Sequence, residues 1–140
     1  MAADDVPDGY SPADLGSGFG AAFGPVWLDR ARHRLAFRVA ANHANPVGLC
    51  HGGALATFAD AQLIAIRAGR EEGQPHTPTI SLSVDYLASA ALGDWVEATV
   101  ELVRETRSLI FVQSVLRVAG APVARTSAIY RNHRNAGEAE

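Results

Sequence analysis

The residues of this chain that could do chemistry are concentrated between Asn45 and Asp60. The segment ending in His51-Gly52-Gly53 is followed by a run of helix-forming residues. Two glycines at the start of a helix leave backbone N–H groups that another molecule can approach closely. The helix macrodipole adds about half a positive charge at that end. This pattern is typical of a site for a negative oxygen, such as the oxyanion formed during acyl transfer.

Asp60 is the only carboxylate between Gly52 and Arg70. On a helix its neighbours are mostly apolar, and a partly desolvated carboxylate is a stronger base. Helical periodicity alone leaves two interpretations open. Asp60 is either a general base, or part of an ordinary solvated helix face together with Thr57 and Arg67.

Other reactive side chains give weaker patterns. Cys50 and His51 are adjacent, and adjacent residues of an extended chain point to opposite sides, which argues against a nucleophile–base pair. His51 is therefore interpreted as an anchor for its loop. His43, His51 and Asp60 lack the paired spacing of a metal site, and no G-x-S-x-G motif is present. We therefore expect no metal ion and no serine-hydrolase mechanism.

One helix and several strands must position these residues. Helix formers run from Gly52 to about Ala68, with Gly69 as a plausible C-cap. A hairpin is expected over 26–40. Alternating apolar residues then predict strands at Ile80–Tyr86, Trp95–Val103, Leu109–Val118 and Pro122–Tyr130.

Burial and turn length together predict the fold class. The turns between the last strands are short, so these strands should be antiparallel neighbours. The long helix is the one partner large enough to cover the sheet. We therefore expect an α+β domain with an antiparallel sheet of about five or six strands wrapped around one long central helix. The strand at the sheet's edge favours pairing with a second copy, hence a homodimer.

In the first strand after the helix, a strict period of two places Ile80, Leu82 and Tyr86 on one face. Thr79 would then lie on the opposite face with Ser81.

Composition limits the function further. The chain has 140 residues, of which 48% are hydrophobic, enough for one domain. All 12 basic residues are arginine and the net charge is −3, so Schiff-base chemistry is excluded and nucleic acid is an unexpected partner. Cys50 is the single cysteine, the N-terminus is acidic, and no apolar run approaches about 18 residues. We expect a cytoplasmic protein without a membrane partner.

The motif Asn45-Pro46-Val47-Gly48-Leu49-Cys50-His51-Gly52-Gly53-Ala54, followed by Thr57 and Asp60, resembles the signature of the hotdog-fold acyl-CoA thioesterases, in the PaaI-like and THEM-type branch. Ser83–Leu87 and Ala91–Asp94 match the same pattern. The resemblance covers about residues 23–134. It leaves residues 1–22 as a loosely structured N-terminal arm and 135–140 as a C-terminal tail.

This resemblance implies a sheet wrapped around a helix and a homodimer with active sites at the subunit interface, with dimers pairing into a tetramer. Asp60, contributed by the other subunit, would be the general base or the nucleophile. Asn45 and the Gly52 N–H would polarise the thioester carbonyl. Thr79 would orient the attacking water, at a position where related sequences carry serine.

The remaining implied contacts concern the substrate. The positions expected to bind it are His51, Gly53, Arg107, Ser108 and Arg131, with Arg134 as a further candidate. Arginine forks suit the phosphates of coenzyme A, and no cofactor is expected besides coenzyme A as part of the substrate. The acyl pocket is expected at Phe58, Ile80 and Leu82, together with residues of the partner subunit.

The expected reaction is hydrolysis of an aryl- or medium-chain acyl-CoA thioester to a free acid and coenzyme A. The alternatives are an acyl-CoA-binding sensor that does not hydrolyse its ligand, and a hotdog dehydratase or hydratase. The abundance of alanine and the absence of lysine suggest a bacterial genome rich in G and C.

Overall fold

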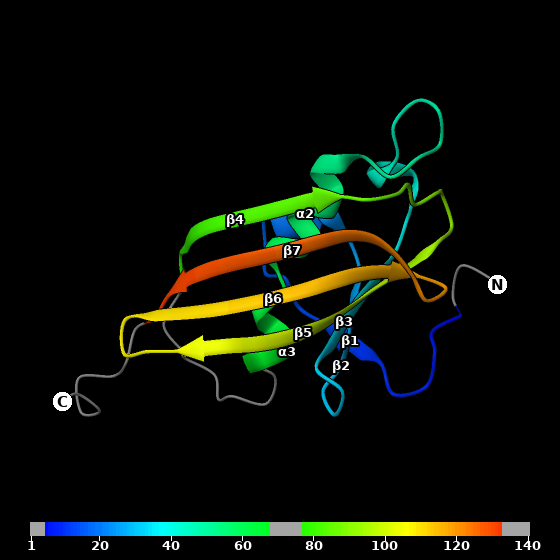
Figure 1. Ribbon diagram of the computed structural model, residues 1–140. Helices are drawn as coiled ribbons and strands as arrows, with labels where there is room; N and C mark the ends of the chain where they lie inside the picture. Colours follow the sequence, from blue (N-terminus) through cyan, green and yellow to red (C-terminus); the bar gives the residue numbers. More distant parts are fainter. Residues whose placement is uncertain (1–4, 68–76, 133–140) are drawn as a thin grey trace.

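A computed structural model describes residues 5–67 and 77–132 (Figure 1). Seven strands form one antiparallel sheet in the order β1-β2-β3-β5-β6-β7-β4, which curves around α2 and α3. The elements are β1 (Ser11–Ala13), α1 (Phe19–Phe23), β2 (Val26–Asp29), β3 (Arg34–Arg38), the 3-10 turn η1 (Ala41–His43), α2 (Gly52–Asp60), α3 (Leu63–Arg67), β4 (Thr79–Tyr86), β5 (Trp95–Glu105), β6 (Leu109–Val118) and β7 (Ala121–Arg131).

The predicted α+β fold is confirmed. The hairpin β2–β3 and the meander β5–β6–β7 lie where the alternation of apolar residues predicts them. The core between the sheet and the helices is filled by large side chains from both layers, with Phe37 of β3 against Phe58 of α2 at its centre. Burial of this apolar surface holds α2, and with it Gly52 and Asp60, at a fixed place on the sheet.

The central helix is interrupted directly after Asp60, where the sequence predicts a continuous helix. An uninterrupted helix would pair the amide of Ile64 with the carbonyl of Asp60. Here the Ile64 amide bonds to Ala61 O at 3.1 Å, and the hydroxyl of Tyr130 on β7 donates to Asp60 O at 2.9 Å. A side-chain donor has therefore taken the place of a backbone donor, which ends α2 and tightens the next turn. The predicted helix end at Ala68 and Gly69 lies outside the described residues.

A β-bulge at the start of β4 corrects the predicted strand faces. The pairing of β4 with β7 shifts between Thr79 and Ser81, so that Ile80 is an extra residue in the ladder. An extra residue reverses the alternation of side chains on one side of the bulge. Thr79 therefore faces the helix together with Leu82, whereas Ile80 is 54% exposed.

Part of the N-terminal arm has regular structure. Strand β1 pairs with β2 and adds a seventh strand to the five or six predicted. Helix α1 follows it, and its last residue, Phe23, is buried against Phe37 at a ring distance of 5.0 Å. The predicted tail at 135–140 lies outside the described residues.

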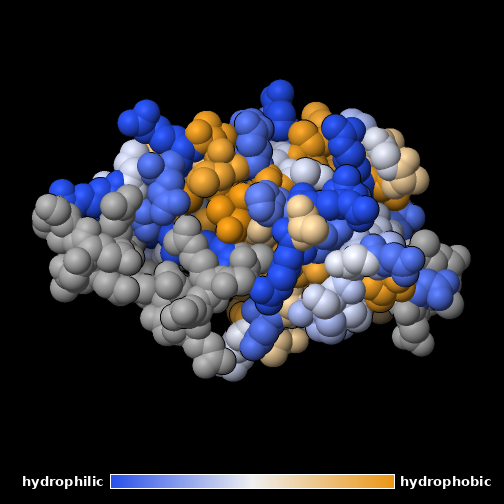
Figure 2. All heavy atoms as spheres, turned by 90° about the horizontal axis from the view of Figure 1, so that it is seen from below, coloured by the Kyte–Doolittle hydropathy of each residue, from blue (hydrophilic) through white to orange (hydrophobic). Residues whose placement is uncertain are grey.

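The surface mixes apolar and hydrophilic residues. Seen from below, apolar residues gather near the middle of the face and hydrophilic residues border them (Figure 2). Among the described residues, the large apolar side chains that remain exposed are Phe19, Val47, Ile80, Tyr86, Leu87, Leu92, Leu102 and Val103. In the same part of the chain, no helix is long and apolar enough to cross a lipid bilayer.

Candidate active site

The carboxylate of Asp60 is held at the end of α2 by a hydroxyl from β4. Thr79 Oγ1 donates to Asp60 Oδ1 at 2.7 Å, and both residues are exposed. The carboxylate is thus held at Oδ1 and remains accessible to water. The bulge in β4 turns Thr79 toward the helix, and the structure thereby brings together two of the predicted site residues.

Tyr130 is a neighbour of this pair that the sequence patterns did not indicate. It lies opposite Thr79 in the β4–β7 ladder, and its hydroxyl fixes the backbone carbonyl of Asp60. Burial raises the pKa of Tyr130 above its ordinary value, and the nearby charge of Asp60 raises it further. Two cross-strand neighbours thus hold Asp60. Thr79 bonds to the side chain of Asp60, and the Tyr130 hydroxyl bonds to the backbone carbonyl of Asp60. A buried tyrosine needs a hydrogen-bond partner for its hydroxyl. That requirement is the signal in the sequence that could have pointed to Tyr130.

The start of α2 presents one open backbone amide. His51 is the N-cap, and its Nδ1 accepts the Gly53 N–H at 2.9 Å. The next two amides, of Ala54 and Leu55, donate to the carbonyl of His51. Among the described residues, nothing accepts the N–H of Gly52. The predicted polarising group at Gly52 is therefore available, whereas the N–H of Gly53 is used by the cap.

Tyr86 covers this end of the helix and was not expected at the site. Its hydroxyl donates to the Gly52 carbonyl at 2.7 Å. A Cβ added at Gly52 would lie 3.4 Å from the Tyr86 ring, at van der Waals contact.

Asn45 uses one end of its amide to build the loop before α2. Its Oδ1 accepts the N–H groups of Val47 and Leu49 at 3.1 and 3.0 Å. These bonds orient the side chain, and no described group accepts from its Nδ2. The NH₂ group is therefore free to donate to a ligand.

Gly52 and Asp60 stand at opposite ends of α2. Eight residues of helix rise about 12 Å, so within one chain the open amide and the carboxylate cannot contact the same carbonyl group. The structure brings Asp60 to Thr79 and leaves Gly52 at the other end of the helix.

The predicted phosphate-binding positions lie together at one end of the sheet. Arg107 and Ser108 form the turn between β5 and β6, and Arg131 ends β7. Ser108 O accepts the amide of Asn132, and Pro78 O accepts that of Arg131 at 2.9 Å. These bonds place the Arg131 backbone beside the start of β4. Arg134 lies outside the described residues.

Two of the other reactive side chains have structural roles. Burial raises the pKa of Cys50 to about 11, so its thiol is protonated at neutral pH. His43 is buried: its Nδ1 accepts the Ala40 amide and its Nε2 bonds to Phe23 O. No group of three or more potential ligands for a metal ion occurs among the described residues.

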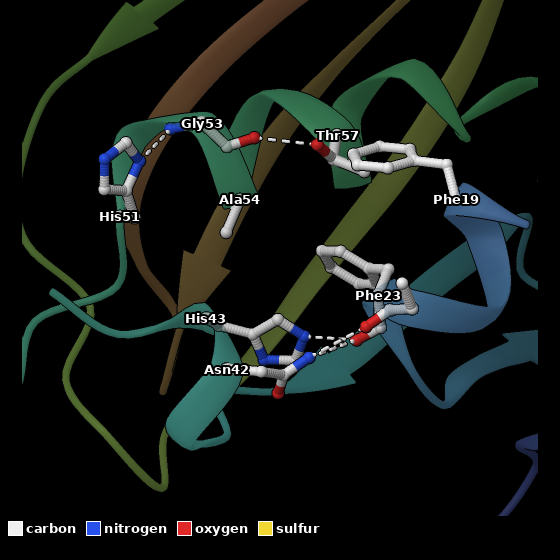
Figure 3. Close-up of a pocket in the computed structure, with 9 residues that line it drawn as sticks. Phe19, Phe23, Asn42, His43, His51, Gly53, Ala54 and Thr57 are labelled. Atoms are coloured by element: carbon white, nitrogen blue, oxygen red, sulfur yellow. Dashed lines mark hydrogen bonds between the residues drawn. The ribbon is translucent and has the colours of Figure 1, made fainter.

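Grooves run along the exposed side of α2, between it and α1. One of about 340 Å³ begins at His51 and Gly53, where Phe19 and Phe23 of α1 face Ala54 and Thr57 (Figure 3). A second, of about 590 Å³, opens beside Asp60 and reaches Leu82 of β4. The predicted acyl-pocket residues are partly corrected: Leu82 lines this second groove, but Phe58 is buried in the core and Ile80 is turned outward by the bulge.

The chain matches a known protein family over the segment that contains α2. The model of the thioesterase superfamily matches residues 47–122, more than half of the chain, from the loop before α2 to the start of β7. The chain belongs to the thioesterase superfamily.

Relatives of this thioesterase-superfamily chain come from several bacteria. A Pseudomonas aeruginosa protein named "Putative esterase PA0474" is 30% identical over 130 residues, which are 90% of this chain and 96% of that protein. The PaaI protein of Thermus thermophilus, a phenylacetic acid degradation protein solved as a mutant, is 24% identical with a TM-score of 0.61, over 71% of this chain and 83% of its own. A hypothetical thioesterase of Streptococcus pneumoniae, solved with coenzyme A, is 21% identical with a TM-score of 0.62, over 73% and 80%. The hotdog fold and the PaaI-like resemblance are thereby confirmed.

Proposed function

We propose that the protein hydrolyses an aryl- or medium-chain acyl-CoA thioester, with Asp60 as the reacting carboxylate. The observation that carries this proposal is the pair Asp60–Thr79, an exposed carboxylate with one oxygen held by a hydroxyl group. Membership of the thioesterase superfamily and the esterase name of the Pseudomonas relative support it.

The site needs two copies of the chain, because Gly52 and Asp60 of one copy are too far apart. Strand β4 is an edge of the sheet and so has one side open for pairing. Ile80, Tyr86 and Leu87, on this strand or next to it, are each 54% exposed. Antiparallel pairing with a second β4 would bring the Tyr86 end of one strand to the Thr79 end of the other.

That pairing would place the two halves of the chemistry together. Tyr86 is bonded to Gly52, and Thr79 is bonded to Asp60. The open amide of one copy and the carboxylate of the other would then meet at the same end of the paired strands. The proposed enzyme is a homodimer with two equivalent sites, and pairing of dimers into a tetramer remains part of the proposal.

The proposed reaction uses these groups in turn. The Gly52 N–H and Asn45 Nδ2 donate to the thioester oxygen and stabilise the negative charge that develops there. As general base, Asp60 Oδ2 takes a proton from a water molecule that attacks the carbonyl carbon; the carbon–sulfur bond breaks, and the proton passes to the coenzyme A thiolate as the acid leaves. As nucleophile, Asp60 Oδ2 attacks the carbonyl carbon itself, and the carbon–sulfur bond breaks to give a mixed anhydride and the coenzyme A thiolate. A water molecule then hydrolyses the anhydride, which releases the acid, restores the Asp60 carboxylate and supplies the proton of the thiol. Thr79 keeps Asp60 oriented throughout.

The adenosine end of coenzyme A is proposed to lie at the β5–β6 turn. Arg107 and Arg131 supply guanidinium groups at that end of the sheet, and Ser108 follows Arg107 in the same turn. His51 and Gly53 line the groove at the start of α2, where the acyl-bearing arm would pass. The coenzyme A in the Streptococcus structure supports a ligand of this class. No further cofactor is part of the proposal.

Replacing Asp60 by Asn tests the proposal. The release of coenzyme A thiol from a panel of acyl-CoA esters, followed with a thiol-reactive dye, should fall by at least about a hundredfold. The matched control is Glu101→Gln, which removes an exposed β5 carboxylate that accepts a bond from Gln113 at 2.8 Å and should keep full activity. An Asp60→Asn protein with wild-type turnover would refute the mechanism. Wild-type protein that binds acyl-CoA without releasing thiol would establish the non-hydrolytic alternative.

A further inference from the structure

Asn132, directly after β7, is a buried side chain whose amide is fully used. It is 7% exposed. Its Nδ2 donates to Glu105 Oε2 at 2.9 Å and to Thr106 O at 2.8 Å, and its Oδ1 accepts from Arg67 Nη2 at 2.9 Å. A side-chain amide donates twice and also accepts, whereas an aspartate carboxylate accepts only and leucine does neither. These bonds therefore require an amide at this position.

The bonds of Asn132 hold Arg107 from both sides. The Thr106 carbonyl accepts from the Asn132 side chain at 2.8 Å, and the Ser108 carbonyl accepts from the Asn132 backbone amide at 2.8 Å. These two carbonyls belong to the residues immediately before and after Arg107. Since Arg131 precedes Asn132 in the chain, one residue fixes the backbone of Arg107 relative to that of Arg131. The β5–β6 turn accordingly lies beside the end of β7 (Figure 1).

The turn itself extends beyond the paired parts of the sheet. The β5–β6 ladder ends at Glu105, and the β6–β7 ladder ends at Leu109 opposite Arg131. Within the turn, the Thr106 amide donates to Leu109 O at 2.8 Å and the Leu109 amide donates to Thr106 Oγ1 at 3.0 Å. These bonds shape the turn without fixing its direction. Asn132 supplies the bonds that attach the turn to β7.

A charged pair holds Asn132 in place. Arg67 is the last residue of α3, its side chain is 12% exposed, and its Nη2 lies 4.0 Å from Glu105 Oε2. Arg67 and Glu105 thus bond to opposite ends of the Asn132 amide and also face each other. A buried polar network in which every member has a partner is rigid. The pair also offsets the charge of a carboxylate that would otherwise repel a phosphate near the turn.

We propose that Asn132 is a positioning residue for coenzyme A, which holds Arg107 and Arg131 at the spacing needed to bind the phosphates of its nucleotide end. The inference rests on the proposed function, which assigns the nucleotide end to this turn. Guanidinium groups bind phosphate by two directed hydrogen bonds, so their placement decides how well they bind. The proposed role concerns binding and not the chemical step, so it should affect KM and leave kcat unchanged.

The test compares one acyl group on coenzyme A and on pantetheine, which lacks the nucleotide and its phosphates. The acyl group is the one that the wild type hydrolyses best in the panel described above. Asn132→Leu and Asn132→Asp should each raise KM for the coenzyme A ester by about tenfold, as expected for the loss of hydrogen bonds to a charged group. Neither should change kcat, and neither should change KM for the pantetheine ester.

Three comparisons make the result specific. Gln113→Leu is the matched control, since it removes an exposed β6 amide that donates to Glu101 of β5 at 2.8 Å and should leave both KM values unchanged. A loss seen with Asn132→Asp but not with Asn132→Leu would be charge repulsion and would refute the positioning role. Arg67→Met removes the donor to Asn132 Oδ1 and should raise KM for the coenzyme A ester by about threefold. This variant decides the question if the Asn132 variants do not fold, as judged by circular dichroism.

Binding measurements separate this inference from the proposed function. The Kd values of coenzyme A and of adenosine 3′,5′-bisphosphate, its nucleotide end, are measured by calorimetry in each variant. If the wild type hydrolyses no thioester but Asn132→Leu weakens both ligands by about tenfold, the proposed function fails and the positioning role stands. If KM rises equally for the coenzyme A and pantetheine esters, or if the folded variants bind the bisphosphate as the wild type does, the positioning role is wrong.

Discussion

Replacing Tyr130 by Phe tests whether the break in the central helix positions Asp60. The substitution deletes one hydroxyl from a residue that is 2% exposed and removes its 2.9 Å bond to Asp60 O. A buried neutral hydrogen bond contributes about 1 kcal/mol net. We expect a loss of about 1 kcal/mol in the free energy of unfolding, with a fall in Tm of about 4 °C for each kcal/mol.

The effect on turnover should exceed the effect on stability. Without the hydroxyl, Asp60 O can accept the Ile64 amide, which now bonds to Ala61, and the helix can close through the break. The carboxylate would then leave Thr79. Because a misplacement of about 1 Å can cost about a hundredfold in rate, we expect kcat to fall by about tenfold to a hundredfold with little change in KM.

The assay is a double-mutant cycle with Thr79→Val, measured by thiol release and by urea unfolding. If Tyr130 acts by keeping Asp60 on Thr79, the two substitutions should be strongly non-additive in kcat and nearly additive in stability. A Tyr130→Phe protein that loses stability but keeps kcat would show that the helix break has a structural role only.

Three further results are expected. His51→Ala removes the N-cap that accepts the Gly53 N–H and should lower the free energy of unfolding by about 1 kcal/mol in urea titrations; an unchanged midpoint would contradict the cap. Cys50, with its pKa raised to about 11 by burial, should react with iodoacetamide at pH 8 much more slowly in the folded than in the urea-unfolded chain, and Cys50→Ala should keep its turnover. Burial raises the pKa of Tyr10 and Tyr130, so above about pH 10 the unfolded chain loses protons that the folded chain keeps. The stability that these two tyrosines contribute is therefore fully present below about pH 10 and is lost as the pH rises. Urea midpoints should decline less steeply with pH in Tyr130→Phe than in the wild type.

The regular parts of the fold follow from local patterns in the sequence. Strands β5, β6 and β7 alternate apolar and polar residues, and short turns join them, so both their existence and their pairing can be predicted. The two glycines after His51 likewise mark the start of α2 correctly. These features depend on residues close together in the chain.

The irregular parts depend on distant residues. The end of α2 is set by Tyr130, seventy residues later, and no helical period contains that information. The order in the N-terminal arm arises in the same way, because α1 is fixed by Asn42 and His43 through carbonyl groups that carry no side-chain pattern. Sequence patterns therefore indicate candidate site residues but not the contacts that orient them.

Both irregularities act on the same aspartate. A regular β4 would turn Thr79 away from the helix, and a regular helix would place a backbone amide where the Tyr130 hydroxyl now bonds to Asp60 O. A bulge and a broken helix both carry a cost in lost regular hydrogen bonding, and they occur on adjacent elements within one group of contacts. Ordinary stability does not require them to coincide. A demand for one carboxylate in one orientation does require it, and this supports the proposal that the reaction takes place at Asp60.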